Sequence, residues 1–258
     1  MRAIDLKGKT ALVMGVANQR SLGWAIASAL SKAGARLALT YQGERLQENV
    51  TALASRIPGS LVMACDVMSE DQMDGVFAQL KGQFGKLDIL VHSIAFARRE
   101  ELEGEFKKTS REGWRIALDV SAYSLVALAN RASRLMDKDG GSILALSFLG
   151  SERVFPNYNV MGTAKAALEQ AARHLAFELG PLNIRVNVIS AGPVPTLSAR
   201  GITGFNLLAT HHRKYAPLGR NIEATEVGDA ALFLSSPLAS GITGTTLYVD
   251  AGYHAMGY

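Results

Sequence analysis

The sequence predicts an α/β fold: a single Rossmann-like domain whose doubly wound parallel sheet has about seven strands, with helices on both faces. Seven short runs rich in valine, isoleucine and leucine are nearly continuous rather than alternating, which is typical of strands buried on both faces of a parallel sheet. Stretches with helical spacing separate these runs, so strand and helix alternate along the chain. No linker, internal repeat or low-complexity tract interrupts the 258 residues, and we therefore expect one domain over residues 1–258.

The expected elements follow in chain order. The apolar runs place strands at residues 10–16, 36–42, 60–67, 87–95, 142–148, 184–190 and 246–252. Helical spacing is clear at residues 23–35 and 69–85, and a further helix is expected to contain residues 158–165. Residues 193–224, between the sixth and seventh strands, form a long irregular excursion, and we expect them to be a substrate-binding lid rather than an idle loop.

Composition and charge limit where the protein works and what it binds. The chain is 48% hydrophobic and has one cysteine, Cys65, which cannot form an internal disulfide and suits a reducing cytosol. Its 27 basic and 23 acidic residues are well mixed, with no basic tract interleaved with aromatic residues. The N-terminus lacks a signal-peptide core, and no apolar run approaches the roughly eighteen residues needed to span a bilayer. We therefore expect a cytoplasmic protein that binds neither nucleic acid nor membrane.

The first strand runs into the segment GVANQRSLG, residues 15–23, and then into a helix. Backbone N–H groups at a helix N-terminus, with glycines that permit close approach, bind the pyrophosphate of a dinucleotide. The usual G-x-G-x-x-G pattern is absent, because only Gly15 and Gly23 remain in a longer turn that contains Ala17 and Ser21. A plain strand–helix turn is the alternative, but the position as the first βα turn of a doubly wound sheet favours a dinucleotide site.

Residues at the ends of the next three strands suit the rest of a dinucleotide. Gln42 ends the second strand, where an acidic residue usually binds the adenosine ribose, and it can bond to the ribose hydroxyls without repelling a 2′-phosphate. Arg45 lies one helical turn away and is suited to such a phosphate, so the predicted preference for NADH over NADPH rests on Gln42. Asp66 ends the third strand, where it either binds the adenine amino group or only forms a turn. Ile94 ends the fourth strand and is expected against the adenosine and the nicotinamide ribose.

The segment YNVMGTAK, residues 158–165, places a tyrosine seven residues before a lysine. Nicotinamide-dependent ketone reductases with this kind of helix space the two residues four apart, and that position is Met161 here. Positions i and i+7 lie on nearly the same helix face, as do i and i+4, so Tyr158 still faces the cofactor but is displaced by about 4.5 Å along the axis. We predict that Tyr158 and Lys165 are the catalytic residues, with Lys165 bonded to the nicotinamide ribose.

The displaced tyrosine indicates reduction of a carbon–carbon double bond. When a double bond conjugated to a thioester is reduced, hydride goes to the β-carbon and negative charge appears on the thioester oxygen, farther along the substrate. The serine of ketone reductases would fall near residue 148, which is Phe148, so both of the usual catalytic positions are apolar. The alternatives are a carbonyl (3-ketoacyl) reductase of the same fold, a non-catalytic dinucleotide-sensing protein, and a silent helix in which Tyr158 only packs.

Over essentially the whole chain, the sequence resembles the bacterial enoyl-[acyl-carrier-protein] reductases, a divergent branch of the short-chain dehydrogenase/reductase superfamily. The matching features are GVANQRSLG, TYQ, CDV, HSIAFA, YNVMGTAK, ISAGPVPT and REGWRIALDVSAYS, residues 111–124, which the resemblance implies to be one long helix. The spacing Tyr-x6-Lys together with HSIAFA is specific, whereas the glycine turn alone is not. The resemblance implies a homotetramer that uses NADH to reduce the trans-2 double bond of acyl thioesters on acyl carrier protein, in fatty acid elongation.

The resemblance also implies which residues form the site. Cofactor-binding residues are expected at Gly15, Ser21, Leu22, Gln42, Asp66, Val67, Ile94, Lys165, Val194, Pro195, Thr196, Leu197 and Ser198. Substrate contacts are expected at Ala97, Phe148, Tyr158 and Met161. Many family members have a second tyrosine where this chain has Phe148, although the mycobacterial long-chain relatives also have phenylalanine there. Many family members have a basic residue at the position of Pro195. The contacts of that basic residue are therefore not expected in this chain.

The predicted lid has apolar residues whose spacing suits a cover over an acyl chain: Leu197, Ile202, Phe205, Leu207 and Leu208. An ordinary pair of surface helices is the alternative. His211 and His212 are adjacent and point in different directions, so we predict no metal site. Basic residues near the expected pocket mouth either form a solvated surface or bind an acidic carrier protein: Arg98, Arg99, Arg200, Arg213 and Lys214.

Overall fold

The computed structural model describes residues 4–136, 139–197 and 199–257. Parallel strands form one seven-stranded sheet in the order β3-β2-β1-β4-β5-β6-β7. The order reverses between β1 and β4, which is the topological switch point of a doubly wound sheet. The strands are β1 (Thr10–Met14), β2 (Arg36–Tyr41), β3 (Leu61–Ala64), β4 (Ile89–His92), β5 (Gly141–Ser147), β6 (Ile184–Ala191) and β7 (Thr246–Val249). The predicted fold class is confirmed.

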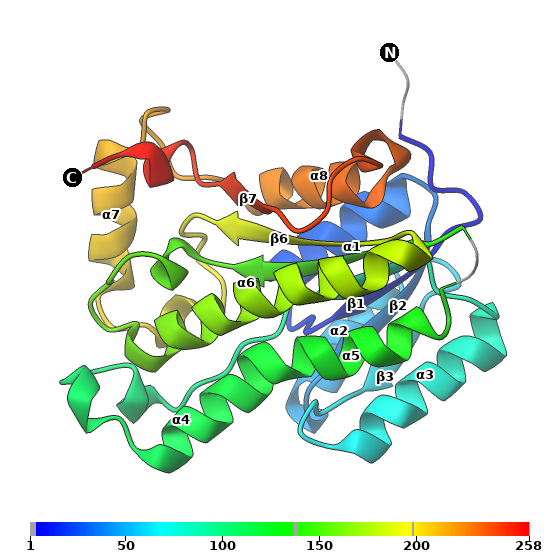
Figure 1. The fold of residues 1–258 in the computed structure, drawn as a ribbon, viewed down its shortest axis with the longest axis horizontal. Coiled ribbons are helices and arrows are strands. Elements are labelled where there is room, and N and C mark those ends of the chain that lie inside the picture. The colour runs from blue at the N-terminus through cyan, green and yellow to red at the C-terminus, as the bar shows by residue number, and fades with distance from the viewer. Residues whose placement is uncertain (1–3, 137–138, 198, 258) are drawn as a thin grey trace.

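Helices cover both faces of this sheet (Figure 1). They are α1 (Leu22–Lys32), α2 (Glu44–Ala54), α3 (Glu70–Phe84), α4 (Arg111–Leu118), α5 (Ser124–Ser133), α6 (Asn159–Leu179), α7 (Phe205–Tyr215) and α8 (Ala224–Ser235). Helices α1, α2 and α8 pack on one face, and α3, α5 and α6 on the other. Residues 111–124, expected as one helix, instead form α4 and a π-helical turn at Asp119–Tyr123 before α5 begins.

Alternate residues of the central strands form two hydrophobic cores. In β1, Ala11 and Val13 belong to the core under α1 and α8, while Leu12 and Met14 belong to the core under α3, α5 and α6. All four side chains are fully buried, as the continuous apolar run predicts. The edge strands β3 and β7 are mostly only partly buried. Burial on both faces therefore holds for the inner strands and is wrong for the two edge strands, each of which has a neighbouring strand on one side only.

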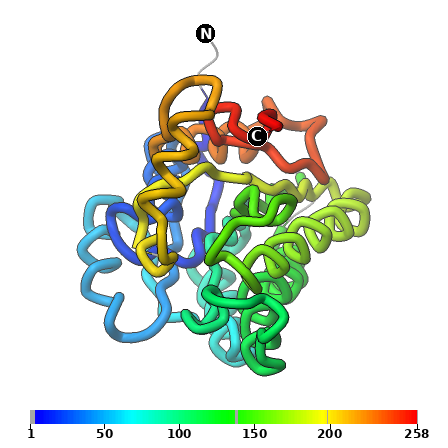
Figure 2. Tube along the Cα trace, turned by 90° about the vertical axis from the view of Figure 1, so that its left-hand side faces the viewer, coloured from blue at the N-terminus to red at the C-terminus, as the bar shows by residue number. Residues whose placement is uncertain are grey.

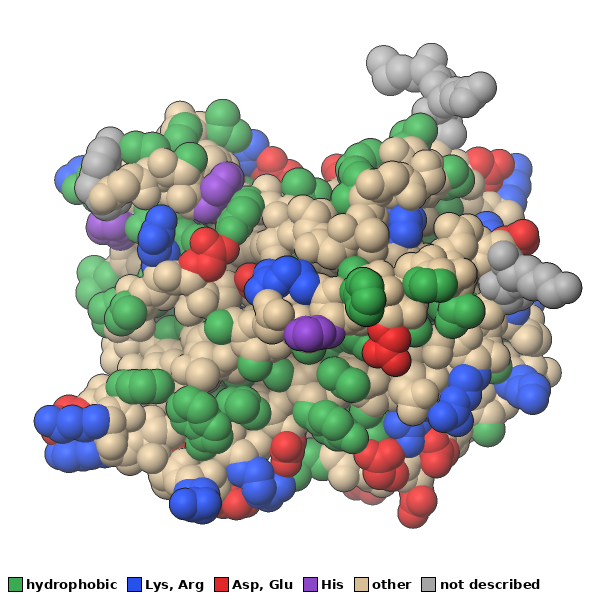
Figure 3. All heavy atoms as spheres, viewed as in Figure 1, with side chains coloured by type: hydrophobic (Ala, Val, Ile, Leu, Met, Phe, Trp, Pro, Cys, Tyr) green, Lys and Arg blue, Asp and Glu red, His purple; other side chains and the backbone are tan. Residues whose placement is uncertain are grey.

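The outer surface of the layer formed by α4, α5 and α6 exposes apolar side chains. Hydrophobic side chains gather over the part of the molecule that these helices cover (Figure 3). Large apolar residues exposed on them are Trp114, Val126 and Phe177, of which Phe177 is 85% exposed. Within the described ranges, no helix is both long enough and apolar enough to cross a bilayer.

The excursion between β6 and β7 places α7 at the end of the sheet to which the strands point (Figures 1 and 2). After β6 the chain forms a 3-10 turn at Ala199–Gly201 and then α7. Helix α8 begins at Ala224 and packs on the sheet beside α1. The segment predicted as a lid therefore comprises α7 and its two flanking loops, and it ends where α8 begins.

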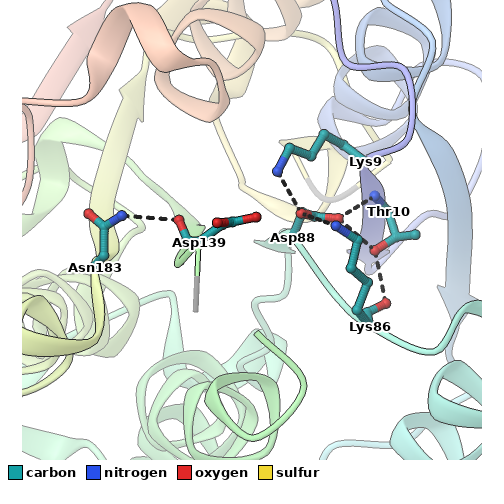
Figure 4. Close-up of polar contacts among 6 residues, drawn as sticks. All are labelled: Lys9, Thr10, Lys86, Asp88, Asp139 and Asn183. Atoms are coloured by element: carbon teal, nitrogen blue, oxygen red, sulfur yellow. Dashed lines mark hydrogen bonds and ion pairs between the residues drawn. The ribbon is translucent and has the colours of Figure 1, made fainter. Parts of the chain in front are cut away.

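A buried carboxylate joins the amino ends of β1 and β4 (Figure 4). Asp88 is 4% exposed, and its Oδ2 accepts hydrogen bonds from the Thr10 N–H at 2.9 Å and the Thr10 hydroxyl at 3.1 Å. Its Oδ1 accepts from Lys9 Nζ at 2.9 Å and from Lys86 Nζ at 3.2 Å. Burial alone would raise the pKa of Asp88, but the bonds from Lys9, Thr10 and Lys86 outweigh it, and the pKa lies below its ordinary value.

Candidate active site

A cavity of about 390 Å³ opens at the carboxyl ends of β1, β4, β5 and β6. It lies at the reversal of strand order between β1 and β4, where open α/β sheets bind their ligands. Residues predicted for the cofactor and for the substrate share its wall: Gly15, Ser21, Leu22, Ile94, Ala97, Phe148, Tyr158, Met161, Lys165, Val194, Thr196 and Leu197.

The first βα turn approaches the neighbouring strand so closely that residue 15 must be glycine. Gly15 has a φ of 85°, and a Cβ there would lie 2.1 Å from the Ser93 carbonyl oxygen. The turn ends at Ser21, the N-cap of α1, whose hydroxyl accepts a hydrogen bond from the Trp24 N–H at 3.3 Å. The start of α1 is therefore part of the cavity wall, where the helix dipole favours a negative group such as a pyrophosphate.

Tyr158 is the N-cap of α6 rather than a residue of the helix. It has φ −121° and ψ −4°, and α6 begins at Asn159. The expectation that residues 158–165 are all helical is therefore wrong at its first position. The chain turns sharply just before, because Asn157 has a φ of 61°, and the Tyr158 carbonyl accepts the first helical hydrogen bond from the Gly162 N–H at 3.0 Å. The Tyr158 ring nevertheless lines the same cavity as Lys165.

Close packing holds the Tyr158 ring. The residue is 9% exposed, and its ring lies edge-on to that of Phe148, with centroids 5.1 Å apart and planes at 71°. Gly150 packs directly on Tyr158, since a Cβ at residue 150 would lie 2.6 Å from the ring. Burial, and to a smaller extent the charge of Glu169, raises the pKa of the Tyr158 phenol. The hydroxyl therefore stays protonated at neutral pH and is able to donate a hydrogen bond.

Lys165 is a buried ammonium that faces the cavity. The residue is 5% exposed, and its Nζ donates a hydrogen bond at 2.7 Å to the Leu146 carbonyl oxygen near the end of β5. An ammonium has three N–H donors, so this bond leaves donors for a ligand. Burial lowers the pKa of Lys165 to about 8, although the charge of Glu169 acts in the opposite direction. Lys165 is therefore mainly protonated at neutral pH and loses its charge as the pH rises past this value.

Gln42 and Asp66 lie outside the cavity but beside each other. Gln42 follows β2 directly, and its Nε2 donates a hydrogen bond at 3.3 Å to Asp66 Oδ2. Asp66 lies beyond the end of β3 rather than at its end, and its Oδ1 accepts from the Met68 N–H at 2.9 Å, which is a turn-forming contact. Val67 and Pro195 do not belong to the described wall of the cavity, and Ser198 lies outside the described residues.

The segment predicted as a lid contributes apolar side chains to the cavity wall: Leu197, Ala199, Ile202, Phe205 and Leu208. Leu207 was predicted with them but lines a second cavity of about 970 Å³, which shares Phe148 and Leu208 with the first. His211 and His212 have different partners: His211 Nδ1 pairs with the Tyr253 hydroxyl at 3.1 Å and His212 Nδ1 with Asn221 Oδ1 at 3.0 Å. Over the described part of the chain, no group of three or more His, Cys, Asp or Glu side chains could hold a metal ion.

The sequence analysis missed residues that line the cavity, or support its wall, through contacts between segments distant in sequence. Leu102 lines the cavity just after a short 3-10 stretch, Arg99–Glu101, which has no periodic signal. Ser121, in the π-helical turn, holds the loop after β4: its hydroxyl oxygen accepts from the Phe96 N–H at 3.0 Å and donates to the Phe96 carbonyl at 3.1 Å. This loop carries Ile94 and Ala97, both of which line the cavity.

Ser147 and Glu169 were also missed. Ser147 lines the cavity, and its hydroxyl donates a hydrogen bond at 2.5 Å to Glu169 Oε1. A sequence signal did exist for Glu169, because it stands four residues after Lys165 and therefore projects from the same helix face.

The fold and the site together define a nicotinamide-dependent reductase of the short-chain dehydrogenase/reductase class, with a dinucleotide-type first βα turn and a tyrosine and a lysine in one cavity wall. Within this class, the chain belongs to the enoyl-[acyl-carrier-protein] reductase family. The family described as "Enoyl-(Acyl carrier protein) reductase" matches residues 15–254.

Similar proteins and structures cover nearly the whole chain. The enoyl-[acyl-carrier-protein] reductase [NADH] of Bacillus cereus is 50% identical over 254 residues, which are 98% of this chain and 99% of that protein. The enoyl-[acyl-carrier-protein] reductase [NADPH] of Staphylococcus aureus is 45% identical over 255 residues, which are 98% of this chain and 99% of that protein. The crystal structure of the Bacillus cereus enzyme with NADP+ and indole naphthyridinone has a TM-score of 0.96 and 50% identity, covering 99% of this chain and 100% of that one. The predicted family and the predicted class of enzyme are confirmed.

Proposed function

We propose that the protein uses NADH to reduce the trans-2 double bond of acyl thioesters carried by acyl carrier protein, in fatty acid elongation, and that Tyr158 and Lys165 are its catalytic residues. The observation that carries this proposal is the presence of both side chains in the wall of one cavity beside the first βα turn. The rest of that wall is largely apolar, as a site for an acyl chain requires.

The residues present fit a dinucleotide. Gly15 leaves space that a Cβ would fill, so the backbone of the first βα turn is open to a pyrophosphate, with Ser21 and the start of α1 behind it. Gln42 is exposed after β2, where its amide suits the adenosine ribose, with Asp66 beside it for the adenine. Arg45, exposed in the first turn of α2, is the residue that would favour NADPH instead. When bound, NADH supplies the hydride for the β-carbon.

The residues of the chain then stabilise the charge that develops on the substrate. The Tyr158 hydroxyl donates a hydrogen bond to the thioester oxygen, which becomes an enolate oxygen when the β-carbon is reduced. Lys165 bonds to the nicotinamide ribose with the donors that Leu146 does not use, and its positive charge favours the enolate. Ala97, Phe148 and Met161 provide apolar surface along the substrate.

Among the described residues, no contact favours the carbonyl reductase. Ser147 is the serine nearest to the position that ketone reductases use, but its hydroxyl donates to Glu169 rather than toward a substrate carbonyl. The position of the usual tyrosine is Met161, which is buried against Tyr158 and Ala164. No second function is therefore proposed.

Assembly, carrier binding and location complete the proposal. A homotetramer is supported by the exposed apolar residues of α4, α5 and α6, which subunit contacts would bury. Binding of acidic acyl carrier protein is supported by exposed basic residues near the cavity: Arg98, Arg200, Arg213 and Lys214. Arg99 is less available, because its Nε bonds to Glu103 at 3.0 Å. A cytoplasmic location is supported by the lone Cys65, which is buried as a thiol.

A substrate panel tests the proposed reaction. Oxidation of NADH is followed with trans-2-enoyl and 3-ketoacyl thioesters of matched chain length, each on acyl carrier protein and on a small thiol. We expect turnover of the enoyl series only. Turnover of the 3-ketoacyl series in its place would identify a carbonyl reductase, and NADH binding without turnover of either series would identify a sensing protein.

A further inference from the structure

Glu169 is a buried carboxylate that the proposed reaction does not use. It is 4% exposed and follows Lys165 by one turn of α6, so the two side chains project from the same helix face. Its Oε1 accepts the hydrogen bond from the Ser147 hydroxyl at 2.5 Å. Burial of a charged group is costly unless a partner compensates for the lost water. The position of this carboxylate therefore calls for a functional explanation.

Lys165 and Glu169 bind consecutive residues at the end of β5. Lys165 Nζ donates to the Leu146 carbonyl at 2.7 Å, and Glu169 accepts from the next residue, Ser147. Two polar contacts thus attach one face of α6 to β5, and both Leu146 and Ser147 line the cavity. A displacement of α6 relative to β5 would move the Lys165 ammonium away from the position in which it is proposed to bind the nicotinamide ribose.

The charge of Glu169 also acts on Lys165. Burial lowers the pKa of Lys165 to about 8, and Glu169 is the group that opposes this shift. A neutral residue at position 169 would leave burial unopposed, and the pKa of Lys165 would fall toward neutrality. The ammonium would then be partly deprotonated at the pH where the enzyme works.

The other titratable groups around this pair do not change charge near neutral pH. Burial, and then the charge of Lys165, lowers the pKa of His92, at the end of β4, to about 3. Burial raises the pKa of Tyr158 and that of Tyr248 on β7, whose hydroxyl donates to Glu152. All three groups therefore stay uncharged between about pH 6 and pH 9. A change in ligand affinity within this range is thus assigned to Lys165.

We propose that Glu169 is a positioning residue for Lys165: through its bond with Ser147 at the end of β5, and with its negative charge one helical turn away, it holds the ammonium in place for the nicotinamide ribose of NADH. This inference rests on the role proposed above for Lys165. It assigns a function to a carboxylate that touches neither the cavity nor the reacting atoms.

Two substitutions separate the charge of Glu169 from its hydrogen bond. Glu169→Gln keeps the shape and an oxygen that accepts from Ser147, and removes only the charge. Ser147→Ala is the matched control, because it removes the hydrogen bond and keeps the charge. The dissociation constant of NADH is measured by fluorescence titration from about pH 6 to pH 9.5 for both variants, the parent protein and Lys165→Met. This readout involves no turnover.

We expect the parent protein to bind NADH with constant affinity up to neutral pH and to lose affinity above the Lys165 pKa of about 8. In Glu169→Gln the loss should begin at lower pH, by about one pH unit, because the burial of Lys165 is then no longer opposed by the charge of Glu169. Ser147→Ala should keep the pH dependence of the parent. Lys165→Met should bind weakly with no pH dependence in this range.

Several results would overturn the inference. They are a parent-like pH dependence in Glu169→Gln, an equal shift in Ser147→Ala, or a pH dependence that persists in Lys165→Met. If Glu169→Gln does not fold, Glu169→Asp replaces it: the carboxylate is then withdrawn by one methylene, a smaller downward shift is expected, and no shift contradicts the inference. A parent protein that binds no NADH at any pH would instead contradict the proposed function.

Discussion

Replacement of Tyr158 by phenylalanine tests the proposed catalytic role most directly. The substitution removes one hydroxyl and keeps the ring, which packs on Phe148 and Gly150. The Tyr158 side chain lines the cavity, and among the described residues its hydroxyl has no hydrogen-bond partner, so its loss breaks no bond of the folded protein. We therefore expect a change in unfolding free energy below about 1 kcal/mol, because substitutions that break no such contact have small effects.

The effect on turnover should be much larger than the effect on stability. Loss of one hydrogen bond to a developing oxyanion lowers kcat by about 10²–10³, or about 2.7–4 kcal/mol. We expect the lower end of this range, about 10², because Lys165 keeps its positive charge beside the enolate. NADH affinity should change little, since the hydroxyl is assigned to the substrate oxygen and Lys165 to the ribose.

The assay is stopped-flow oxidation of NADH with crotonyl and longer enoyl thioesters, together with fluorescence titration of NADH. Tyr123→Phe is the matched control: it removes the same hydroxyl from a tyrosine that is 57% exposed and lies outside the cavity wall. It should turn over at the parent rate. If Tyr158→Phe also turns over at the parent rate, Tyr158 is not the catalytic residue and the reasoning from its place in the cavity is wrong.

Three further predictions concern the cofactor, the carrier protein and stability. Because Gln42 follows β2, kcat/KM should be higher with NADH than with NADPH in steady-state assays; the reverse order would show that Arg45 binds the 2′-phosphate. Raising salt should increase KM for carrier-linked substrate more than for a small thioester, since attraction between exposed charges such as those of Arg213 and Lys214 is screened within about 10 Å at 0.1 M salt; equal responses would exclude these charges as the docking site. Asp88→Asn should lower the free energy of unfolding in urea by about 2 kcal/mol, because hydrogen bonds to a charged group are lost. The Asp88 pKa is lowered on folding. Its stabilisation is therefore present above the ordinary carboxyl pKa of about 3.9 and lost as the pH falls through the lower folded value, so the gap between parent and variant should close in acid; a constant gap would contradict this assignment.

The fold and much of the candidate site could be predicted from local patterns. The continuous apolar run of β1 indicated burial on both faces, and its alternate residues do enter two cores. Gly15 was predicted from its place after the first strand, and the close approach of the Ser93 carbonyl shows why a side chain is excluded there. Strand ends were less accurate: β3 stops at Ala64, so Asp66 lies in the following turn.

The sequence by itself determined the order of strands and helices, the position of the dinucleotide turn and the pairing of Tyr158 with Lys165, because these depend on periodicity and spacing within short segments. Only the tertiary structure decided that Tyr158 precedes α6 rather than belonging to it, and that Phe148 and Gly150 hold its ring. It also decided that Glu169 meets Ser147, twenty-two residues earlier in the chain. Such contacts arise when a helix packs on a strand distant in sequence, and residue spacing within either element carries no information about which side chains then meet.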